Sequence, residues 1–422
     1  MFSRFDRTPA CDGQTDGRPD PGHSICRTSI ASRDKICGRV DNSCVFMYGQ
    51  VFGGWMADRV GGKWLFGGGI LASAVLTLLT PTAAFLHYAV VFCVRMLEGI
   101  FEGIMLPATS ALLSRWTPRE QTTRGATLVF SGEQCGYVVG MLLGGFLSDH
   151  GFAGGWPSVF YVIGSASCVW AVGWFLLCHN SPSTHPRISQ AERQYLEAEV
   201  GVSEKRTSTP WRKIFTSLPL LACSVANFVH QWSYYTLING LPLFYFDVLG
   251  FKMTRNGLLT ALPLLATGGA MLITGQVSDW LRSPRRLSTT TVRKIFCVGG
   301  LIFPGVFLIM AGFLGCDRVL VVLTMIAAMA FQGMTWAFLI VNPLDLSTLH
   351  AATLFGIMNT TACVALIATP QVIGALTYQN PTRVQWQKVF YITAVIECFG
   401  CIVYLLFGSG ELQNWDDDAD LA

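Results

Sequence analysis

The amino-acid sequence predicts an all-α membrane protein built from two helical halves of the same topology. Of its residues, 51% are hydrophobic and only 13% are charged, whereas about 25% are charged in an average soluble domain. The mean hydropathy is +0.45. Apolar stretches long enough to cross a bilayer, which takes about 20 residues, follow one another along most of the chain. Short patterns also recur in the two halves in the same order.

A polar segment precedes the apolar stretches. Residues 1–42 are rich in Asp, Arg, Gly and Thr and contain no apolar run, so we expect a disordered tail without a signal peptide. Residues 43–57 are apolar but too short to span a bilayer. Full-length helices are expected over 64–85, 87–115, 125–147, 157–178, 218–246, 256–281, 294–315, 319–341, 352–376 and 387–408.

The polar connections divide the chain into units. The longest connection, 179–217, predicts a linker that contains a short amphipathic helix. It separates an N-terminal half over 43–178 from a C-terminal half over 218–408, and an acidic tail over 409–422 follows.

The two halves carry matching patterns. Gly54 and Asp58 recur as Gly275 and Asp279, and the run that begins at Trp156 recurs at Trp386. Parallel duplicated halves are typical of transporters, whose site lies near the midplane between the halves. The same offset leaves the first half without its first helix and with a shortened second one. We therefore expect either an incomplete gene model or fragment, or a divergent protein with at most eleven spans.

Basic residues in the loops predict the orientation. The loops at 58–63, 115–124, 179–213 and 282–294 carry most of the Lys and Arg that lie between the predicted spans. The positive-inside rule makes their side cytoplasmic, and the linker and the C-terminus are then cytoplasmic too. The opposite side carries Lys252, Arg255, Arg318, Arg383 and Lys388.

Three charges share one face of the helix predicted over 87–115. Arg95, Glu98 and Glu102 lie three and four residues apart, a spacing that places them together on a helix. A charge at mid-membrane costs about 2.5–3.5 kcal/mol even on the lenient insertion scale. One interpretation is an ion pair that locks the bundle. The other, favoured for intramembrane ionisable residues, is a site that handles an anion and a proton.

Other polar residues inside the predicted spans have two interpretations each. Arg95 is the only base that we expect inside a span, whereas Glu133 and Glu397 join Glu98 and Glu102 as embedded acids. His230 is expected either to contact substrate and relay protons or to pack within the bundle.

Whole classes of function find no support in the sequence. The 14 cysteines lie mostly in apolar stretches, which predicts packing residues and neither a disulfide framework nor a metal site. The sequence contains no nucleophilic array and no phosphate-binding loop, so it does not predict an enzyme. The net charge of +3 is too small to indicate nucleic-acid binding.

The pattern Gly54, Asp58, Arg59, Gly61, Lys63 resembles the loop of the major facilitator superfamily that latches one conformation of its two rocking halves. Physically, Asp58 is placed to accept hydrogen bonds from the N-terminus of a neighbouring helix.

The resemblance narrows to the anion/cation symporters that include sialin, the vesicular glutamate transporters and the sodium–phosphate cotransporters. It rests on Arg95, Glu98, Glu102 and Pro107 in the fourth helix of that family. The presence of both Glu98 and Glu102 makes the pattern most similar to that of sialin. Further matches contain Gln50 and Gly53, Trp232 and Tyr235, Asn256 and Pro263, Gly275 and Asp279, Asn342 and Asp345, and Glu411 and Trp415.

The family pattern also differs at several positions. Members carry a first-helix arginine that has no counterpart here. Sialin and the glutamate transporters have a histidine where this chain has Ser110. The glutamate transporters have an arginine where it has His230.

The resemblance implies a secondary transporter of organic anions, such as sialic acid or another carboxylate, that works by alternating access. Alternatives are a sodium-dependent phosphate or glutamate transporter of the same family, and a non-transporting fragment or regulatory paralogue. We expect H⁺ coupling, with Na⁺ as the alternative, and no cofactor. The partners would be a small anion and the lipid bilayer, and the chain would be a monomer in a lysosomal, vesicular or plasma membrane. The expected substrate and proton residues are Arg95, Glu98, Glu102, His230, Tyr235 and Asn342.

Protonation provides a mechanism. Burial raises the pKa of a carboxylate and a neighbouring Arg lowers it, so a change of access can move the proton. We expect protonation of Glu98 or Glu102 to release Arg95 for an anion.

Overall fold

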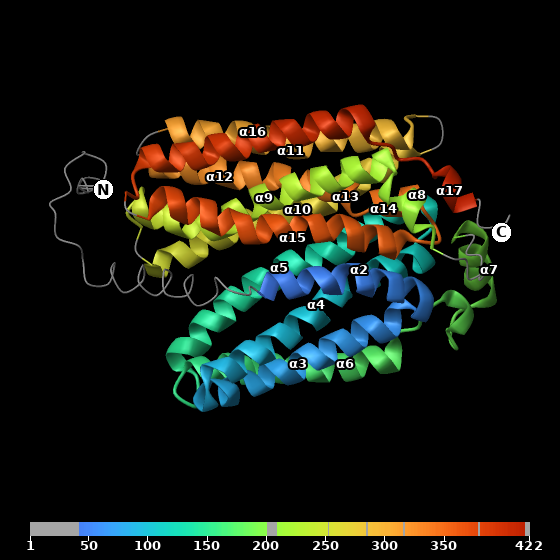
Figure 1. Ribbon diagram of the computed structural model, residues 1–422, viewed down its shortest axis with the longest axis horizontal. Helices are drawn as coiled ribbons and strands as arrows, with labels where there is room; N and C mark the ends of the chain where they lie inside the picture. Colours follow the sequence, from blue (N-terminus) through green and yellow to red (C-terminus); the bar gives the residue numbers. More distant parts are fainter. Residues whose placement is uncertain are drawn as a thin grey trace.

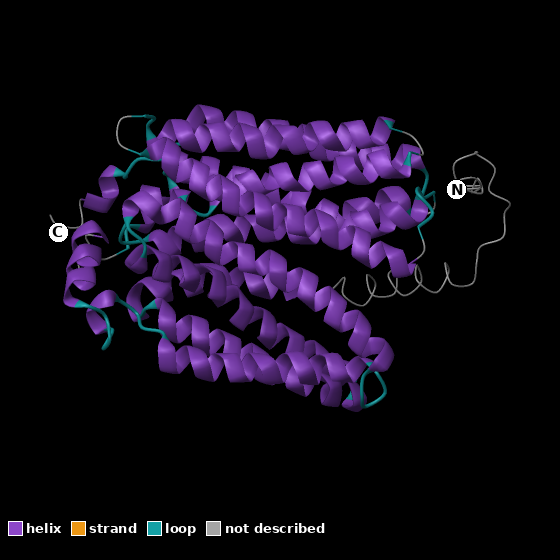
Figure 2. Ribbon diagram, turned by 180° about the vertical axis from the view of Figure 1, so that it is seen from behind, coloured by secondary structure: helices purple, strands orange, loops and turns teal. Residues whose placement is uncertain are grey.

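The computed structural model describes residues 42–200, 209–251, 253–283, 286–314, 317–378 and 380–417, and all regular elements in these ranges are helices (Figures 1 and 2). The predicted N-terminal tail, apart from its last residue, lies outside the described residues, and so does the place of the predicted missing first helix. Eight of the described helices are long and apolar enough to span a membrane. The chain is a multi-pass membrane protein.

The first half is a bundle in which α4 packs against α2 and α3, and α3 packs against α6 (Figure 1). The stretch predicted as a short stub over 43–57 belongs to a helix of 19 residues. The helices of this half are α2 (Asn42–Val60), α3 (Gly62–Leu86), α4 (Tyr88–Trp116), α5 (Thr122–His150) and α6 (Trp156–Leu177).

The second half repeats this plan. Its helices are α9 (Leu218–Asp247), α10 (Met253–Arg282), α11 (Thr289–Phe313), α12 (Arg318–Gln332), α13 (Trp336–Leu339), α14 (Asn342–Leu346), α15 (Ala351–Thr377) and α16 (Arg383–Phe407). The span predicted over 319–341 is present as Arg318–Leu346, but a 3₁₀ turn that begins at Gly333 interrupts it after α12. Gly333 lies so close to α10 that an added Cβ would come within 2.7 Å of the Thr267 carbonyl oxygen.

The halves meet along two equivalent helix pairs, α2 with α15 and α10 with α5 (Figure 1). Glycines permit both contacts. A Cβ on Gly54 would overlap the Ala352 carbonyl oxygen, and a Cβ on Gly275 would overlap the Thr127 hydroxyl. The recurring Gly-and-Asp pattern therefore marks corresponding contacts between the two halves.

Short helices gather at one end of the molecule, which we call the α8 end (Figure 1). They are α7 (Gln190–Val200), which is the predicted amphipathic helix of the linker, α8 (Trp211–Phe215) and α17 (Asn414–Asp417). The predicted acidic tail is docked over its described part. Trp415 is buried in a cluster with Ile214 and Leu354, and Asp416 accepts a hydrogen bond from the Thr348 amide at 2.8 Å.

Candidate functional site

A cavity of about 130 Å³ lies between the two halves. Its walls include large apolar rings, among them Phe130, Trp336 and Phe355. Its polar lining comes from both halves: Glu133 and Tyr137 of α5, Asn227, His230 and Tyr235 of α9, and Asn359 of α15. An apolar pocket with a few convergent polar groups is the usual form of a small-molecule site.

His230 is held in one orientation. Its Nδ1 lies 2.8 Å from the Thr335 hydroxyl, whose own proton goes to the Gln332 carbonyl oxygen. Nδ1 of the neutral ring is therefore the donor, and Nε2 is an acceptor. Nε2 is buried and has no hydrogen-bond partner among the described residues. His230 thus packs against Trp336, with ring centroids 5.6 Å apart, and also offers a polar atom to the cavity that it lines.

One side-chain hydrogen bond joins the halves beside the cavity. The Tyr234 hydroxyl of α9 donates to Gln134 Oε1 of α5 at 3.0 Å. Its neighbour Tyr235 is half-buried and lines the cavity. Gln134 and Thr335 were not among the predicted site residues, because neither residue type signals a site within an apolar span.

Two of the three charges of α4 form an ion pair. Arg95 Nη1 lies 2.6 Å from Glu98 Oε2, and the Thr77 hydroxyl of α3 donates to Glu98 Oε1 at 2.6 Å. The guanidinium also lies 5.3 Å from the ring centroid of Phe160 in α6. Arg95 and Glu98 therefore form an ion pair inside the first half, as in the bundle-locking interpretation.

Glu102 has a different environment. Its side chain is exposed among the described residues, and it lies one helical turn from Leu106, which lines the cavity. Glu102 thus lies on an α4 face that reaches the cavity one turn further on, at Leu106.

Two residues lie away from the cavity. Asn342 donates from Nδ2 to the Ser409 carbonyl oxygen at 2.7 Å and so anchors the chain after α16. Glu397 is 1% exposed, and an added Cβ on Gly305 would lie 2.7 Å from its Oε2. Glu397 is therefore packed between α16 and α11.

Asp58 caps the N-terminus of α15 across the contact between the halves. Its Oδ2 accepts a hydrogen bond from the Thr353 amide at 2.9 Å, and its Oδ1 accepts one from the Ala352 amide at 3.3 Å. Amides at a helix N-terminus lack partners within the helix, so an aspartate there is stabilising. We call this contact the α2–α15 latch.

The residues that follow Asp58 shape the turn into α3. Gly61 has a φ of 97°, which favours glycine. Lys63 donates its amide to Asn180 Oδ1 at 2.9 Å. The Arg59 guanidinium lies over the Trp55 ring at 4.2 Å.

Asp279 makes the equivalent contact in the second half, with its Oδ2 accepting from the Arg124 amide of α5 at 2.7 Å. We call this contact the α10–α5 latch. Next to it lies Arg293, which is fully buried and pairs with Asp345 at 2.7 Å. The prediction that Arg95 is the only embedded base is therefore wrong. Arg293 lies near the start of α11, where sequence alone placed it in a loop.

Comparison with known proteins identifies this architecture. The sequence profile described as Major Facilitator Superfamily matches residues 42–370. The chain belongs to the major facilitator superfamily.

Relatives in the superfamily include vesicular glutamate transporters. The chain is 38% identical over 374 residues to vesicular glutamate transporter 3 of Danio rerio, covering 87% of this chain and 62% of that protein. It is 38% identical to vesicular glutamate transporter 2 of Homo sapiens, covering 87% and 63%. It is 37% identical to vesicular glutamate transporter 1 of Bos taurus, covering 88% and 67%. These matches place it in the anion/cation symporter family. The chain thus spans about three fifths of the length of the first two relatives.

Solved structures of the superfamily share the fold. The proton:xylose symporter XylE bound to 6-bromo-6-deoxy-D-glucose superposes with a TM-score of 0.70 at 11% sequence identity, covering 88% of this chain and 86% of that one. A double Trp mutant of XylE gives 0.72, covering 93% and 90%. The relatives favour the glutamate alternative over the sialic acid interpretation of the sequence.

Proposed function

We propose that this chain is a secondary transporter of small carboxylate anions, with glutamate as the first candidate substrate. The observation that carries this proposal is a cavity between the halves whose polar lining comes from both of them, in a member of the anion/cation symporter family whose relatives include vesicular glutamate transporters. No enzymatic step is part of the proposal.

Alternating access follows from the two latches. Asp58 holds α2 to α15, and Asp279 holds α10 to α5. When both latches are made, the halves are closed at those helix ends. Breaking both lets the halves rock apart there and opens the cavity to that side, as expected for duplicated halves around a fixed midplane site.

The cavity offers hydrogen bonds to a carboxylate substrate. Tyr235 and Asn359 supply donors, and His230 becomes a donor at Nε2 when it is protonated. Arg95 can bind the anion only after it leaves Glu98, because the two are paired.

Glu102 and Glu133 are the further carboxylates in this part of the molecule, and we assign the coupling proton to Glu102 because it shares the helix face of Arg95.

We expect no cofactor, a vesicular membrane and a monomer, with α7, α8 and the C-terminus in the cytoplasm.

The test is uptake into proteoliposomes. The purified full chain is given radiolabelled L-glutamate, sialic acid or inorganic phosphate under an imposed pH gradient, membrane potential or Na⁺ gradient. We expect glutamate uptake driven by the proton gradient or the potential. Sialic acid uptake alone would support the sialin-like alternative, and Na⁺-driven phosphate uptake would support the cotransporter alternative. No uptake beyond that of empty liposomes would contradict transport and favour a regulatory paralogue.

A further inference from the structure

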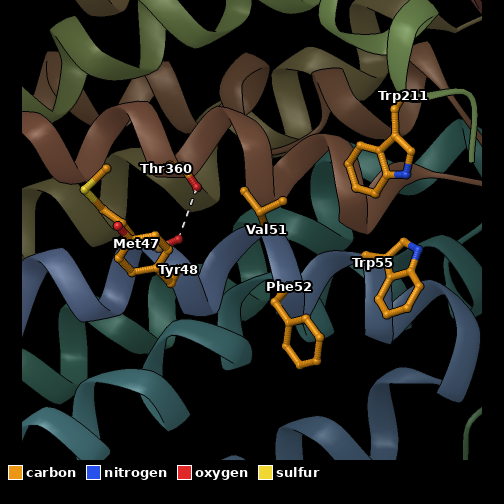
Figure 3. A pocket seen from close by; sticks show the side chains of 7 residues that line it. All are labelled: Met47, Tyr48, Val51, Phe52, Trp55, Trp211 and Thr360. Carbon is orange, nitrogen blue, oxygen red and sulfur yellow. Dashed lines mark hydrogen bonds between the residues drawn. The ribbon is translucent and has the colours of Figure 1, made fainter.

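An apolar groove of about 670 Å³ runs along the outer side of the contact between α2 and α15 (Figure 3). It is separate from the central cavity and shares no lining residue with it. Its walls come from Tyr48, Phe52 and Trp55 of α2, Trp211 of α8 and Thr360 of α15. The groove therefore touches both halves of the transporter and the end of the linker.

The α2 wall is an aromatic face. Tyr48, Phe52 and Trp55 lie four and three residues apart, so they share one side of the helix. Tyr48 is 80% and Phe52 is 55% exposed among the described residues. Thr360 does not make the groove polar, because its hydroxyl already donates to the Gly356 carbonyl oxygen at 2.7 Å. The groove is therefore apolar along its length and suits a hydrocarbon chain.

One end of the groove is marked by two indoles. Trp55 and Trp211 lie at the same end, away from Met47 and Tyr48 (Figure 3). Tryptophan is enriched where a bilayer meets water. The position of α8 is set by Ile214, which is fully buried in a cluster with Leu354. We infer that this end of the groove lies at the headgroup level of one leaflet.

The same end is basic. Arg59 stacks on Trp55, and Arg212 directly follows Trp211 with an exposed side chain. Asp58, the acid beside Arg59, is taken up by the α2–α15 latch. An apolar channel with a cationic end is complementary to a lipid with an anionic headgroup.

We propose that this groove binds one anionic phospholipid of the adjacent leaflet. An acyl chain lies along Tyr48, Phe52 and Trp55, and the headgroup phosphate and carboxylate are held by Arg59 and Arg212. Because the lipid touches α2, α15 and α8 together, it stabilises the closed α2–α15 latch. The proposed lipid site does not depend on which anion is transported. Its assignment to the cytoplasmic leaflet depends on the proposed orientation.

Photoactivatable lipids test the site. The purified full chain is reconstituted in phosphatidylcholine vesicles that contain a trace of phosphatidylserine or phosphatidylcholine with a diazirine in its acyl chain. Labelled peptides are then mapped by mass spectrometry. We expect residues 48–55 and 211–215 to be labelled at least about fivefold more by the phosphatidylserine probe, since one basic residue at a membrane surface is worth about that factor.

The variant Arg212→Gln tests the headgroup end. It should remove most of the preference for phosphatidylserine while leaving labelling by phosphatidylcholine unchanged, which also shows that the protein is folded. Arg286→Gln is the matched control, because Arg286 stacks on Trp280 at 3.9 Å in the second half, outside the groove. It should keep the full preference.

Two results would overturn the proposal. Equal labelling of the groove by both probes would show ordinary contact with bulk lipid. Labelling that avoids residues 48–55 would show that protein, such as residues 1–41, covers the groove. Neither result depends on uptake of any substrate, so failure of this proposal is distinct from failure of the transport proposal.

Discussion

Glu98 and Glu102 lie four residues apart on α4 and have different neighbours. Glu98 is buried between Arg95 and Thr77, so its charge is matched within the first half. Glu102 has no ion-pair partner among the described residues, and it lies one turn from Leu106, which lines the cavity. Residue type and spacing predicted the same role for both glutamates. Only the side-chain contacts show that Glu98 is the ion-paired one.

Glu102→Gln removes the carboxylate to which we assign the coupling proton. We expect glutamate uptake driven by an imposed pH gradient to fall to background, while exchange of glutamate at equal pH continues, because the cavity keeps its other polar groups. Counterflow and gradient-driven uptake are measured on the same proteoliposomes. Glu192→Gln in the exposed α7 is the control. Intact pH-driven uptake in the Glu102 variant would contradict this role.

Asp58→Ala removes the cap from α15. Loss of an N-cap costs about 1 kcal/mol, so we expect the Thr353 amide to lose about fivefold of its protection from hydrogen exchange. Asp279→Ala should act in the same way on the Arg124 amide of α5 and leave Thr353 unchanged. Each variant is thus the control for the other. Loss of protection at both sites in both variants would show global loosening instead of two separate latches.

At the scale of elements, close contacts between helices depend on residues without a Cβ. Gly54 and Gly275 allow α2 and α10 to touch the opposite half. The repeated pattern predicted a functional motif at these positions but not which helix each would meet. Pairing α2 with α15 and α10 with α5 is a property of the assembled bundle.

Gly54→Ala adds a methyl group where the Ala352 carbonyl oxygen lies. Overpacking of this kind costs about 1–3 kcal/mol, so we expect a lower thermal unfolding temperature and reduced uptake. Gly68→Ala in α3 meets no atom within 4 Å and should be neutral or slightly stabilising, because alanine favours a helix over glycine. A variant Gly54→Ala that unfolds at the wild-type temperature would show that the two helices can separate there without loss.

The docking of α17 should depend on pH through His350, which precedes α15. Burial lowers the pKa of His350, Asp416 opposes this, and Arg59 adds to the lowering. A histidine with a lowered pKa disfavours the folded contact once it protonates, so its contribution is intact above the unfolded pKa of about 6.5 and is lost as pH falls below that value. We expect hydrogen exchange in residues 346–350 and 409–417 to quicken below that pH. His350→Gln should remove the pH dependence, and an unchanged profile in that variant would exclude His350 as its source.

On the scale of the whole molecule, the α8 end collects the linker, the C-terminal segment and the two latches. Arg59, Arg115 and Lys213 are among the basic residues at this end, as the loop charges predicted. One side of the membrane therefore carries the latches, these basic residues and the Trp55 and Trp211 end of the apolar groove.

An epitope fused after Ala422 reports the side on which this end lies. If the α8 end is cytoplasmic, antibody stains the tag once digitonin has opened only the plasma membrane. A second tag inserted after Asn380, between α15 and α16, should need detergent that opens every membrane. Staining in the reverse order would invert the proposed orientation and assign the proposed lipid site to the other leaflet.

Hydropathy and residue spacing were sufficient to predict an all-α membrane protein, most of its long apolar helices, the duplicated halves and the pattern around Asp58. These features are local or periodic, because each apolar stretch must satisfy its own backbone as a helix. The separation of Arg95 and Glu98 from the cavity, the burial of Arg293, the anchoring role of Asn342 and the break at Gly333 depended on the tertiary structure. Each of them is decided by which side chains of distant helices come within hydrogen-bond or van der Waals distance, and the spacing along one helix does not contain that information.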